Sequence, residues 1–332
     1  MEASYYEQAK NSLRCRLCPH ECIISNGKAG ICNVRRNVNG VLMAETWSRL
    51  SAVNTDPVEK KPLYHFHPSK NILSIGSVGC NMKCRCCQNW HISQSPVAGY
   101  SFGRSVEPDE VVNMALSDDD NMGIAYTYNE PVVWYEFMLA VARLAASNRL
   151  KNVMVSNGYI TQKPLEELLG YMDAFNIDLK GFSEEFYLKF TGARLEPVLK
   201  TLKQIRKAAK HLEITNLVIP SLNDRTDLFA DMTNWIADEL GPETVLHLSR
   251  YHPDYNLYTE PTPPVKLKEF YEIARKKLAY VYVGNISMGA LQNTYCSKCG
   301  ELLVTRQGYQ IAVTGLTNTG ACVRCGNQVM II

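Results

Sequence analysis

Four cysteines stand together in residues 79–89, which read Gly79-Cys80-Asn81-Met82-Lys83-Cys84-Arg85-Cys86-Cys87-Gln88-Asn89. Cys80, Cys84 and Cys87 follow a C-x3-C-x2-C spacing. Three cysteines on a short loop can bind three irons of a [4Fe–4S] cluster and leave the fourth iron without a protein ligand. That iron has an open position for a small chelating molecule. The spacing therefore predicts a cluster that does chemistry on a bound molecule.

Two other kinds of site also use clustered cysteines. A zinc site usually takes its ligands from two separated pairs, and a ferredoxin-type cluster needs a fourth cysteine further along the chain. The next cysteine after Cys87 is Cys296. The triplet therefore favours a three-cysteine cluster. Cys86 is then a spare thiol beside the cluster, or a ligand in a different register.

The composition excludes several classes of protein. Apolar residues make up 46% of the 332 residues and charged residues 20%, which is ordinary for a soluble globular protein. A net charge of +2 gives no indication of nucleic acid or anionic membrane as a partner. No apolar run approaches a length of about 18 residues, and the first residues lack the apolar core of a signal peptide. We expect a cytoplasmic protein.

The chain is rich in cysteine, with twelve residues that fall in three clusters. Clustered cysteines in a long chain without a secretion signal argue for metal binding rather than disulfides. They also indicate a reducing and oxygen-poor setting, because an exposed iron–sulfur cluster is easily oxidised.

Short apolar runs alternate with helical patterns after the cysteine loop. The predicted strands are residues 72–77, 122–127, 152–156, 174–179, 212–219, 244–250 and 279–283. The predicted helices are residues 107–117, 131–147, 164–171, 195–210, 226–239 and 265–277. This alternation indicates parallel βα units, hence an α/β fold. Periodicity alone does not distinguish a (β/α) barrel from a doubly wound sheet.

Two C-x2-C-Gly knuckles stand near the end of the chain. Their spacing is typical of a tetrahedral four-thiolate site, most simply a zinc ribbon, and their cysteines are Cys296, Cys299, Cys322 and Cys325. Iron is the alternative, because soft thiolate sites accept either metal. Such a module usually stabilises a protein or binds partners rather than catalysing.

A further cysteine quartet lies near the beginning of the chain and comprises Cys15, Cys18, Cys22 and Cys32. Four cysteines at this spacing can close around one zinc ion. An auxiliary iron–sulfur cluster is the alternative, and we favour zinc. His20 is a possible substitute ligand and more simply a bystander.

Five segments together resemble one group of enzymes. They are the N-terminal quartet, Asp56-Pro57-Val58-Glu59-Lys60-Lys61-Pro62, Cys87-Gln88-Asn89, Tyr128-Asn129-Glu130-Pro131 and Arg250-Tyr251-His252-Pro253-Asp254-Tyr255. The chain resembles radical S-adenosylmethionine (SAM) enzymes, and within them the radical SAM component of the AmmeMemoRadiSam system, a relative of pyruvate formate-lyase activating enzyme. The resemblance covers residues 12 to 285. Cys86 departs from the family, which usually has an aromatic residue there.

The resemblance implies a partial or complete (β/α) TIM-like barrel with its functional residues at the C-terminal ends of the strands. It divides the chain into a Cys-rich N-terminal metal-binding region (1–70), a radical SAM barrel (71–290) and a C-terminal zinc-ribbon-like module (291–332). In this family the reduced cluster cleaves SAM to methionine and a 5′-deoxyadenosyl radical.

The SAM-binding residues that the resemblance implies follow the predicted strands, and they are Asn129, Glu130, Ser156, Asn157, Asp178, Lys180 and His252. Glu130 would hold the methionine ammonium, or it simply opens a helix. Ser156 and Asn157 would bind the ribose, or they form a turn without a ligand. Lys180 would pair with the SAM carboxylate, or with Asp178 on the same face of its strand.

The motifs and the resemblance leave three hypotheses for the function. The enzyme modifies a small molecule by hydrogen abstraction or adenosyl addition, which we favour. Alternatively it activates a glycyl radical enzyme by hydrogen abstraction from a backbone glycine. The third hypothesis is a non-catalytic metal-binding scaffold. The expected partners are a low-potential ferredoxin or flavodoxin and the other AmmeMemoRadiSam components.

Overall fold

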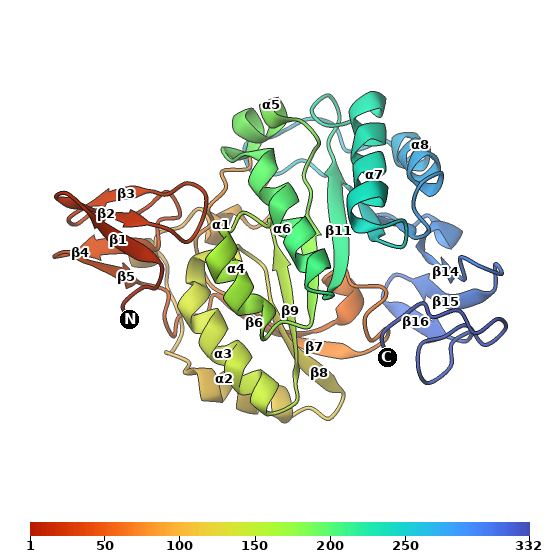
Figure 1. Cartoon of the computed structure of the whole chain (residues 1–332), viewed down its shortest axis with the longest axis horizontal. Helices are drawn as coiled ribbons and strands as arrows, with labels where there is room; N and C mark the ends of the chain where they lie inside the picture. The colour runs from red at the N-terminus through yellow and green to blue at the C-terminus, as the bar shows by residue number, and fades with distance from the viewer.

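The computed structural model describes all 332 residues, and one eight-stranded sheet forms its centre (Figure 1). Its strands follow the order of the chain across the sheet, from β13 at one edge to β6 at the other. They are β6 (Ala52–Pro57), β7 (Asn71–Gly76), β8 (Asn121–Tyr126), β9 (Lys151–Ser156), β10 (Ala174–Asp178), β11 (His211–Val218), β12 (Val245–Arg250) and β13 (Val281–Gly284). Strands β7 to β13 run parallel, and β6 pairs antiparallel with β7.

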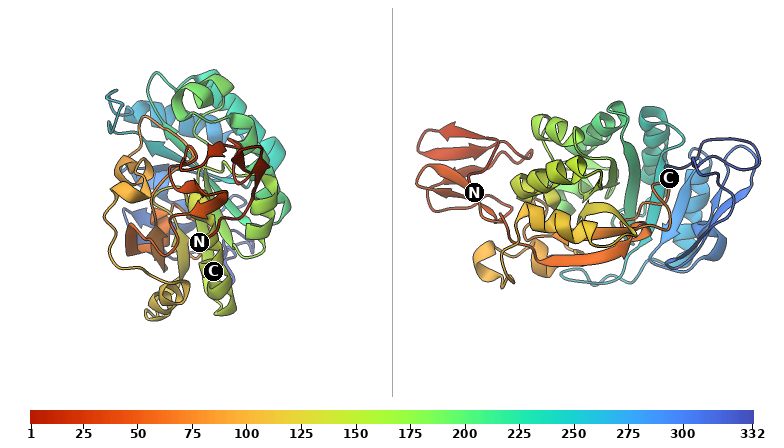
Figure 2. Two further views of the ribbon diagram at one scale, coloured as in Figure 1. Left: turned by 90° about the vertical axis from the view of Figure 1, so that its left-hand side faces the viewer. Right: turned by 90° about the horizontal axis from the view of Figure 1, so that it is seen from below.

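Helices connect the parallel strands and pack on the outer face of the sheet (Figures 1 and 2). The main ones are α2 (Pro108–Leu116), α3 (Tyr135–Ser147), α4 (Gln162–Leu169), α6 (Leu195–Lys207), α7 (Thr226–Leu240) and α8 (Pro264–Arg275). The α2 helix begins with a capping box between Glu107 and Glu110, which satisfies the free amides of its first turn. Phe229 of α7 and Phe270 of α8 stack with ring centres 3.9 Å apart.

The predicted α/β barrel is confirmed, in its partial form. Every predicted strand and helix is present within a few residues of its expected bounds. No strand pairing joins β13 to β6, so the sheet curves without closing. The N-terminal part of the chain contributes β6 to this sheet, ahead of the barrel start predicted at residue 71. The domain boundaries themselves stay a prediction.

The N-terminal region that carries the cysteine quartet forms two small sheets at one end of the long axis (Figure 2), with Cys15 at the end of a strand and the other three cysteines in the connections. They consist of β1 (Tyr6–Ala9), β2 (Ser12–Cys15) and β3 (Ile23–Ser25), and of β4 (Arg35–Val38) and β5 (Val41–Ala44). Leu13 and Val34 belong to the same buried cluster as the helices of the barrel. These sheets therefore share the core of the barrel.

The C-terminal module lies at the opposite end of the long axis (Figures 1 and 2). It is a three-stranded sheet of β14 (Thr294–Tyr295), β15 (Leu302–Gln307) and β16 (Gln310–Val313) with a small core of its own. Arg306 of β15 is buried and donates to the backbone oxygen of Tyr64. The module thus covers the open side between β13 and β6. None of the helices has the length and apolar character needed to cross a lipid bilayer.

Candidate functional site

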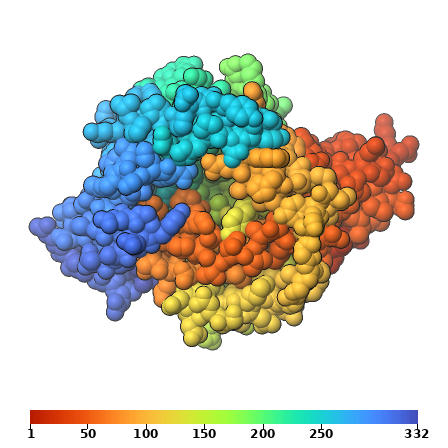
Figure 3. Space-filling view, turned by 180° about the vertical axis from the view of Figure 1, so that it is seen from behind, coloured from red at the N-terminus to blue at the C-terminus, as the bar shows by residue number.

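A cavity of about 540 Å³ lies at the C-terminal ends of the parallel strands. Figure 3 shows the hollowed face of the molecule, between the orange segment that includes residues 50–90 and the blue C-terminal part. All three triplet cysteines and six of the seven predicted SAM-binding residues line it, namely Cys80, Cys84, Cys87, Asn129, Glu130, Ser156, Asn157, Asp178 and Lys180. We call it the cluster cavity. Its position is the one in which βα barrels keep their active sites.

The donor set of this cavity fits an iron–sulfur cluster held by three thiolates. Cys80, Cys84 and Cys87 are half-buried and open onto the same space. Burial raises the pKa of Cys84 to about 11, so the free thiol is protonated and binding of metal releases its proton. Cys86 is 7% exposed and also lines the cavity.

Hydrogen bonds from neighbouring strand ends hold the cysteine loop in its shape. Asn129 donates to the backbone oxygen of Gly79 at 2.8 Å. Its amide oxygen accepts from the backbone N–H of Ser77 and from the indole of Trp134, each at 3.2 Å. Asn157 donates to the side-chain oxygen of Asn81 at 2.8 Å. Both amides therefore position the loop, a role that the sequence interpretation did not give them.

Glu130 lies at the centre of a second set of hydrogen bonds. Its carboxylate accepts from the hydroxyl of Ser156 at 2.7 Å and from the backbone N–H groups of Asn157 and Val132 at 2.9 and 3.0 Å. It caps a short 3-10 helix, as the alternative reading expected. Burial raises the pKa of Glu130 to about 7. A cation in the cavity would favour its ionised form.

Lys180 and Asp178 form an ion pair at the end of β10. The ammonium lies 2.7 Å from the carboxylate. Burial opposes the charge of Lys180, but Asp178 and the nearby Cys84 raise the pKa of Lys180 well above its usual value. The ion pair between Asp178 and Lys180, which the sequence analysis gave as the alternative to a contact with SAM, is therefore present. Lys180 also lines the cavity.

His252 is the one predicted SAM-binding residue that does not line the cavity. It lies in the loop after β12, where its ring is 3.4 Å from the backbone oxygen of Asn285. Ser249 and Asn285 line the cavity in this region instead. A contact between His252 and SAM stays a prediction.

A second cavity of about 550 Å³ continues from the first along the open side of the barrel. It shares part of its lining with the cluster cavity and extends to Glu59, Tyr64, His247 and Gln292. We call it the side cavity. Tyr309, at the tip of the hairpin between β15 and β16, lines both cavities and is 60% exposed.

The sequence interpretation missed the residues of the side cavity. Lys60 and Lys61 carried the family resemblance but received no role. Thr215 of β11 and His247 and Ser249 of β12 face the interior. Their alternation with apolar residues along the strands could have indicated a polar barrel lumen. No sequence pattern indicated a role for Tyr309, because this residue reaches the site from the separate C-terminal module.

The N-terminal cysteines converge on a narrow apolar cavity of about 20 Å³. Its lining includes the whole quartet, Cys15, Cys18, Cys22 and Cys32. Arg35 also lines it, and its guanidinium lies 2.8 Å from Glu136 of α3. The four thiols line one space, but they are not drawn together within 4.8 Å as the C-terminal sulfur atoms are. A metal at this quartet stays a prediction.

The C-terminal cysteines have the geometry of a site for a single metal ion. The sulfur atoms of Cys296, Cys299, Cys322 and Cys325 all lie within 4.8 Å of one another. Two of the pairs, Cys296–Cys325 and Cys299–Cys322, are 3.6 Å apart. Four thiolates arranged tetrahedrally at about 2.3 Å from a zinc ion would be about 3.8 Å apart. The predicted four-thiolate site is therefore consistent with this arrangement.

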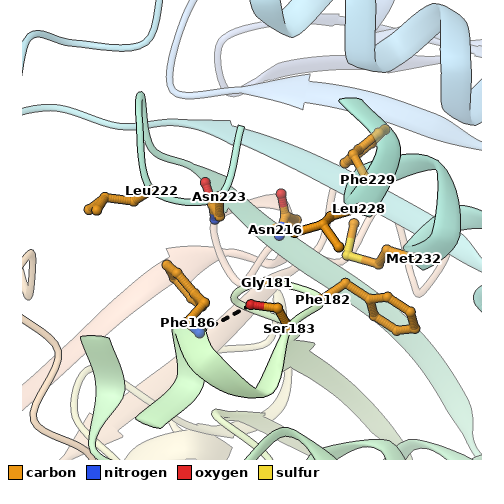
Figure 4. Close-up of a pocket in the computed structure, with 10 residues that line it drawn as sticks. All are labelled: Gly181, Phe182, Ser183, Phe186, Asn216, Leu222, Asn223, Leu228, Phe229 and Met232. Atoms are coloured by element: carbon orange, nitrogen blue, oxygen red, sulfur yellow. Dashed lines mark hydrogen bonds between the residues drawn. The ribbon is translucent and has the colours of Figure 1, made fainter. Parts of the chain in front are cut away.

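A smaller pocket between β11 and α7 is shown in Figure 4. Its volume is about 10 Å³, and its lining includes Phe186, Phe229 and Asn216. The amide oxygen of Asn216 is buried there without a partner. This space accommodates one water molecule and no larger ligand.

Comparison with known proteins agrees with the site. A model of the Radical SAM superfamily matches residues 74–232. The chain is 42% identical over 338 residues to the uncharacterized protein MJ0808 of Methanocaldococcus jannaschii, covering 100% of this chain and 99% of that protein. It is 22% identical over 160 residues to the pyruvate formate-lyase-activating enzyme of Staphylococcus epidermidis, covering 44% of this chain and 61% of that enzyme.

A solved structure shares the fold. It is a radical SAM methyltransferase from Sphaerobacter thermophilus, with a TM-score of 0.52 and 12% identity over 66% of this chain and 67% of that chain. The fold, the cysteine loop at the strand ends and the family model agree with one another. The chain belongs to the radical SAM superfamily of enzymes and is distantly related to the pyruvate formate-lyase-activating enzymes.

Proposed function

We propose that this enzyme generates a 5′-deoxyadenosyl radical and uses it to modify a small-molecule substrate. The observation that carries the proposal is the side cavity, a space of about 550 Å³ that adjoins the cluster cavity. Pockets of 300 to 1,000 Å³ are typical of small-molecule sites. The C-terminal module borders this space through Tyr309, which favours a small substrate over a protein loop.

Membership of the superfamily implies a [4Fe–4S] cluster and SAM as cofactors. In our proposal Cys80, Cys84 and Cys87 hold the cluster. When bound there and reduced by one electron, the cluster would cleave SAM to methionine and a 5′-deoxyadenosyl radical. Glu130, buried and with its pKa raised to about 7, offers a carboxylate to the methionine ammonium.

Lys180 offers an ammonium to the methionine carboxylate in this proposal, and Asp178 holds it in position at 2.7 Å. Asn129 and Asn157 hold the cysteine loop, and Ser156 orients Glu130. The substrate either gives a hydrogen atom to the radical, which yields 5′-deoxyadenosine and a substrate radical, or takes up the adenosyl group at an unsaturated carbon, which leaves the unpaired electron on the adduct. A low-potential ferredoxin or flavodoxin supplies the electron.

The two flanking cysteine quartets have structural roles in this proposal. Zinc is the metal of the C-terminal site, and its 3.6 Å sulfur separations support a mononuclear centre. The N-terminal site holds zinc or an auxiliary cluster. Membership in the AmmeMemoRadiSam system is part of the proposal, with the companion proteins as partners.

Activation of a glycyl radical enzyme is the second candidate function. The relationship to the pyruvate formate-lyase-activating enzyme of Staphylococcus epidermidis favours it. That match covers 44% of this chain and 61% of that enzyme.

The two candidates differ in where the substrate is found. Anaerobic enzyme, SAM and dithionite are incubated with a cell extract that has been separated into a small-molecule fraction and a protein fraction. We expect the small-molecule fraction alone to raise the release of methionine from SAM, which accompanies both routes, above the level without extract. Stimulation by the protein fraction alone, with a glycyl radical signal in electron paramagnetic resonance, would favour the second candidate.

A further inference from the structure

We infer that the side cavity binds a small polar molecule that carries a carboxylate or phosphate together with a hydroxyl or amino group. This inference rests on the proposed function, because it names the substrate class of the same site. The anion is recognised by Lys60 and Lys61, and the donor group by Glu59 and His247.

The lysine pair has an excess of positive charge. The ammonium groups of Lys60 and Lys61 lie 2.7 and 2.6 Å from the two oxygens of one carboxylate, that of Asp56. Burial opposes ionisation of Asp56, but these contacts and a hydrogen bond from Tyr128 lower the pKa of Asp56 below its usual range. Two cations thus share one anion at the wall of the cavity. An incoming carboxylate or phosphate would supply the second negative charge.

The residue before the lysine pair, Glu59, has a carboxylate oxygen without a partner. Glu59 is 4% exposed, and its Oε1 accepts from the backbone N–H of Ser69 at 2.8 Å. Its Oε2 is buried with no hydrogen bond, although the residue lines the cavity. A buried carboxylate oxygen without a partner is costly. A hydroxyl or amino group of the ligand would satisfy it.

His247 presents a ring nitrogen to the same space. Its Nε2 lies 2.6 Å from the carboxylate of Glu213. Burial opposes ionisation of Glu213, but hydrogen bonds from His211 and His247 lower its pKa well below the usual value. The charged carboxylate therefore accepts a hydrogen bond from Nε2–H, and no hydrogen bond within the protein uses Nδ1. A hydroxyl or amino group of the ligand can pair with Nδ1.

The test measures binding rather than turnover. Anaerobically reconstituted enzyme with SAM bound is titrated in a calorimeter with malate, with malamide, which is its uncharged diamide, and with inorganic phosphate. We expect malate or phosphate to bind and malamide to bind at least tenfold more weakly. Binding of malate alone identifies a carboxylate substrate, and binding of phosphate alone a phosphorylated one.

The matched variants are Lys60→Gln and Lys200→Gln. Lys200 also pairs with a carboxylate four residues earlier, but on the exposed face of α6. Lys60→Gln should weaken anion binding about tenfold or more, as expected for loss of one charge-assisted hydrogen bond, and Lys200→Gln less than twofold. If the variant fails to fold, crystals of the wild-type enzyme with SAM bound still test the inference. After a soak in malate or phosphate they should show the anion beside Lys60 or Lys61.

Several results would overturn the inference. They are absence of binding by both anions, equal binding of malate and malamide, unchanged binding by Lys60→Gln, and displacement of SAM by the anion. Formation of 5′-deoxyadenosine without anion binding would reject this inference and keep the proposed function. Anion binding without any SAM cleavage would reject the proposed function and keep the assignment of the side cavity as an anion site.

Discussion

The imidazole Nε2 of His20 lies 2.7 Å from the backbone oxygen of Asn81. His20 stands between two cysteines of the N-terminal quartet, and Asn81 follows the first cysteine of the catalytic triplet. Gly79 adds a second contact, because a Cβ at this position would lie 2.7 Å from the backbone oxygen of Cys32. The N-terminal quartet therefore packs directly against the loop that carries the cluster.

Replacement of His20 by alanine should loosen the cluster loop. Burial lowers the pKa of His20, so its ring is neutral and donates an ordinary hydrogen bond, worth about 1 kcal/mol. We expect iron to leave the reconstituted His20→Ala protein about fivefold faster under a chelator. Absorbance of the cluster at 400 nm follows the release. The exposed His91 supplies the control variant, and equal rates for His20→Ala and His91→Ala would contradict the coupling.

The two adjacent cysteines of the loop should differ in their effect on the cluster. In our proposal Cys87 is the third ligand, as the C-x3-C-x2-C spacing predicts, and Cys86 is the buried residue before it in the chain. Cys87→Ala should lose most of the iron after reconstitution, whereas Cys86→Ala should keep about four irons per chain. Iron analysis and the spectrum of the reduced cluster distinguish the variants. The reverse result would mean that Cys86 is the ligand.

Asn129→Ala should impair retention of the cluster rather than affinity for SAM. The amide of Asn129 makes three hydrogen bonds to Ser77, Gly79 and Trp134, which leaves little capacity for a cofactor. Loss of these bonds should cost about 2 to 4 kcal/mol of local stability.

Iron content and calorimetric SAM binding to the loaded fraction separate the two roles of Asn129. Asn148→Ala, at the exposed end of α3, is the matched control. A large rise in the dissociation constant for SAM with normal iron content would instead assign Asn129 to the cofactor.

Acid should destabilise the protein through His65. Burial lowers the pKa of His65 to about 3, and its ring is hydrogen-bonded to Tyr282 at 2.6 Å. Between pH 7 and pH 5 the unfolded chain takes up a proton at this site and the folded chain does not. The free energy of unfolding should therefore fall by about 2 kcal/mol over this range from His65 alone.

The comparison between wild type and His65→Gln isolates the contribution of His65. The variant keeps a polar side chain but cannot titrate, so its stability should fall less with acid than that of the wild type by about 2 kcal/mol. Denaturant titrations at both pH values provide the measurement. Parallel pH profiles would show that His65 does not contribute.

The sequence was sufficient to predict the barrel and its elements, for a physical reason. Parallel strands buried on both faces have continuous apolar runs, and the helices between them have a clear periodicity. The triplet was also easy to find, because its three cysteines are close together in the chain and line one cavity. Their role as cluster ligands stays a prediction. Residues such as Glu130 and Asp178 were expected at strand ends and are found there.

The partners of these side chains were harder to predict. Ser156 bonds to Glu130 and Asn157 to Asn81, across separate βα units. The side cavity combines Lys60, His247 and Tyr309, which lie far apart in the chain. No local pattern encodes such long-range contacts. Strand-end position alone does not fix the course of a loop, so the sequence did not show that His252 would lie outside the lining of the cluster cavity.

The central claim is reductive cleavage of SAM at the cluster held by Cys80, Cys84 and Cys87. The most direct test is anaerobic reconstitution with iron and sulfide, followed by dithionite and SAM, with 5′-deoxyadenosine measured by chromatography. We predict 5′-deoxyadenosine from the wild type and none from Cys80→Ala. Cleavage at the wild-type rate by Cys80→Ala, or no cleavage by wild type loaded with about four irons per chain, would contradict the claim.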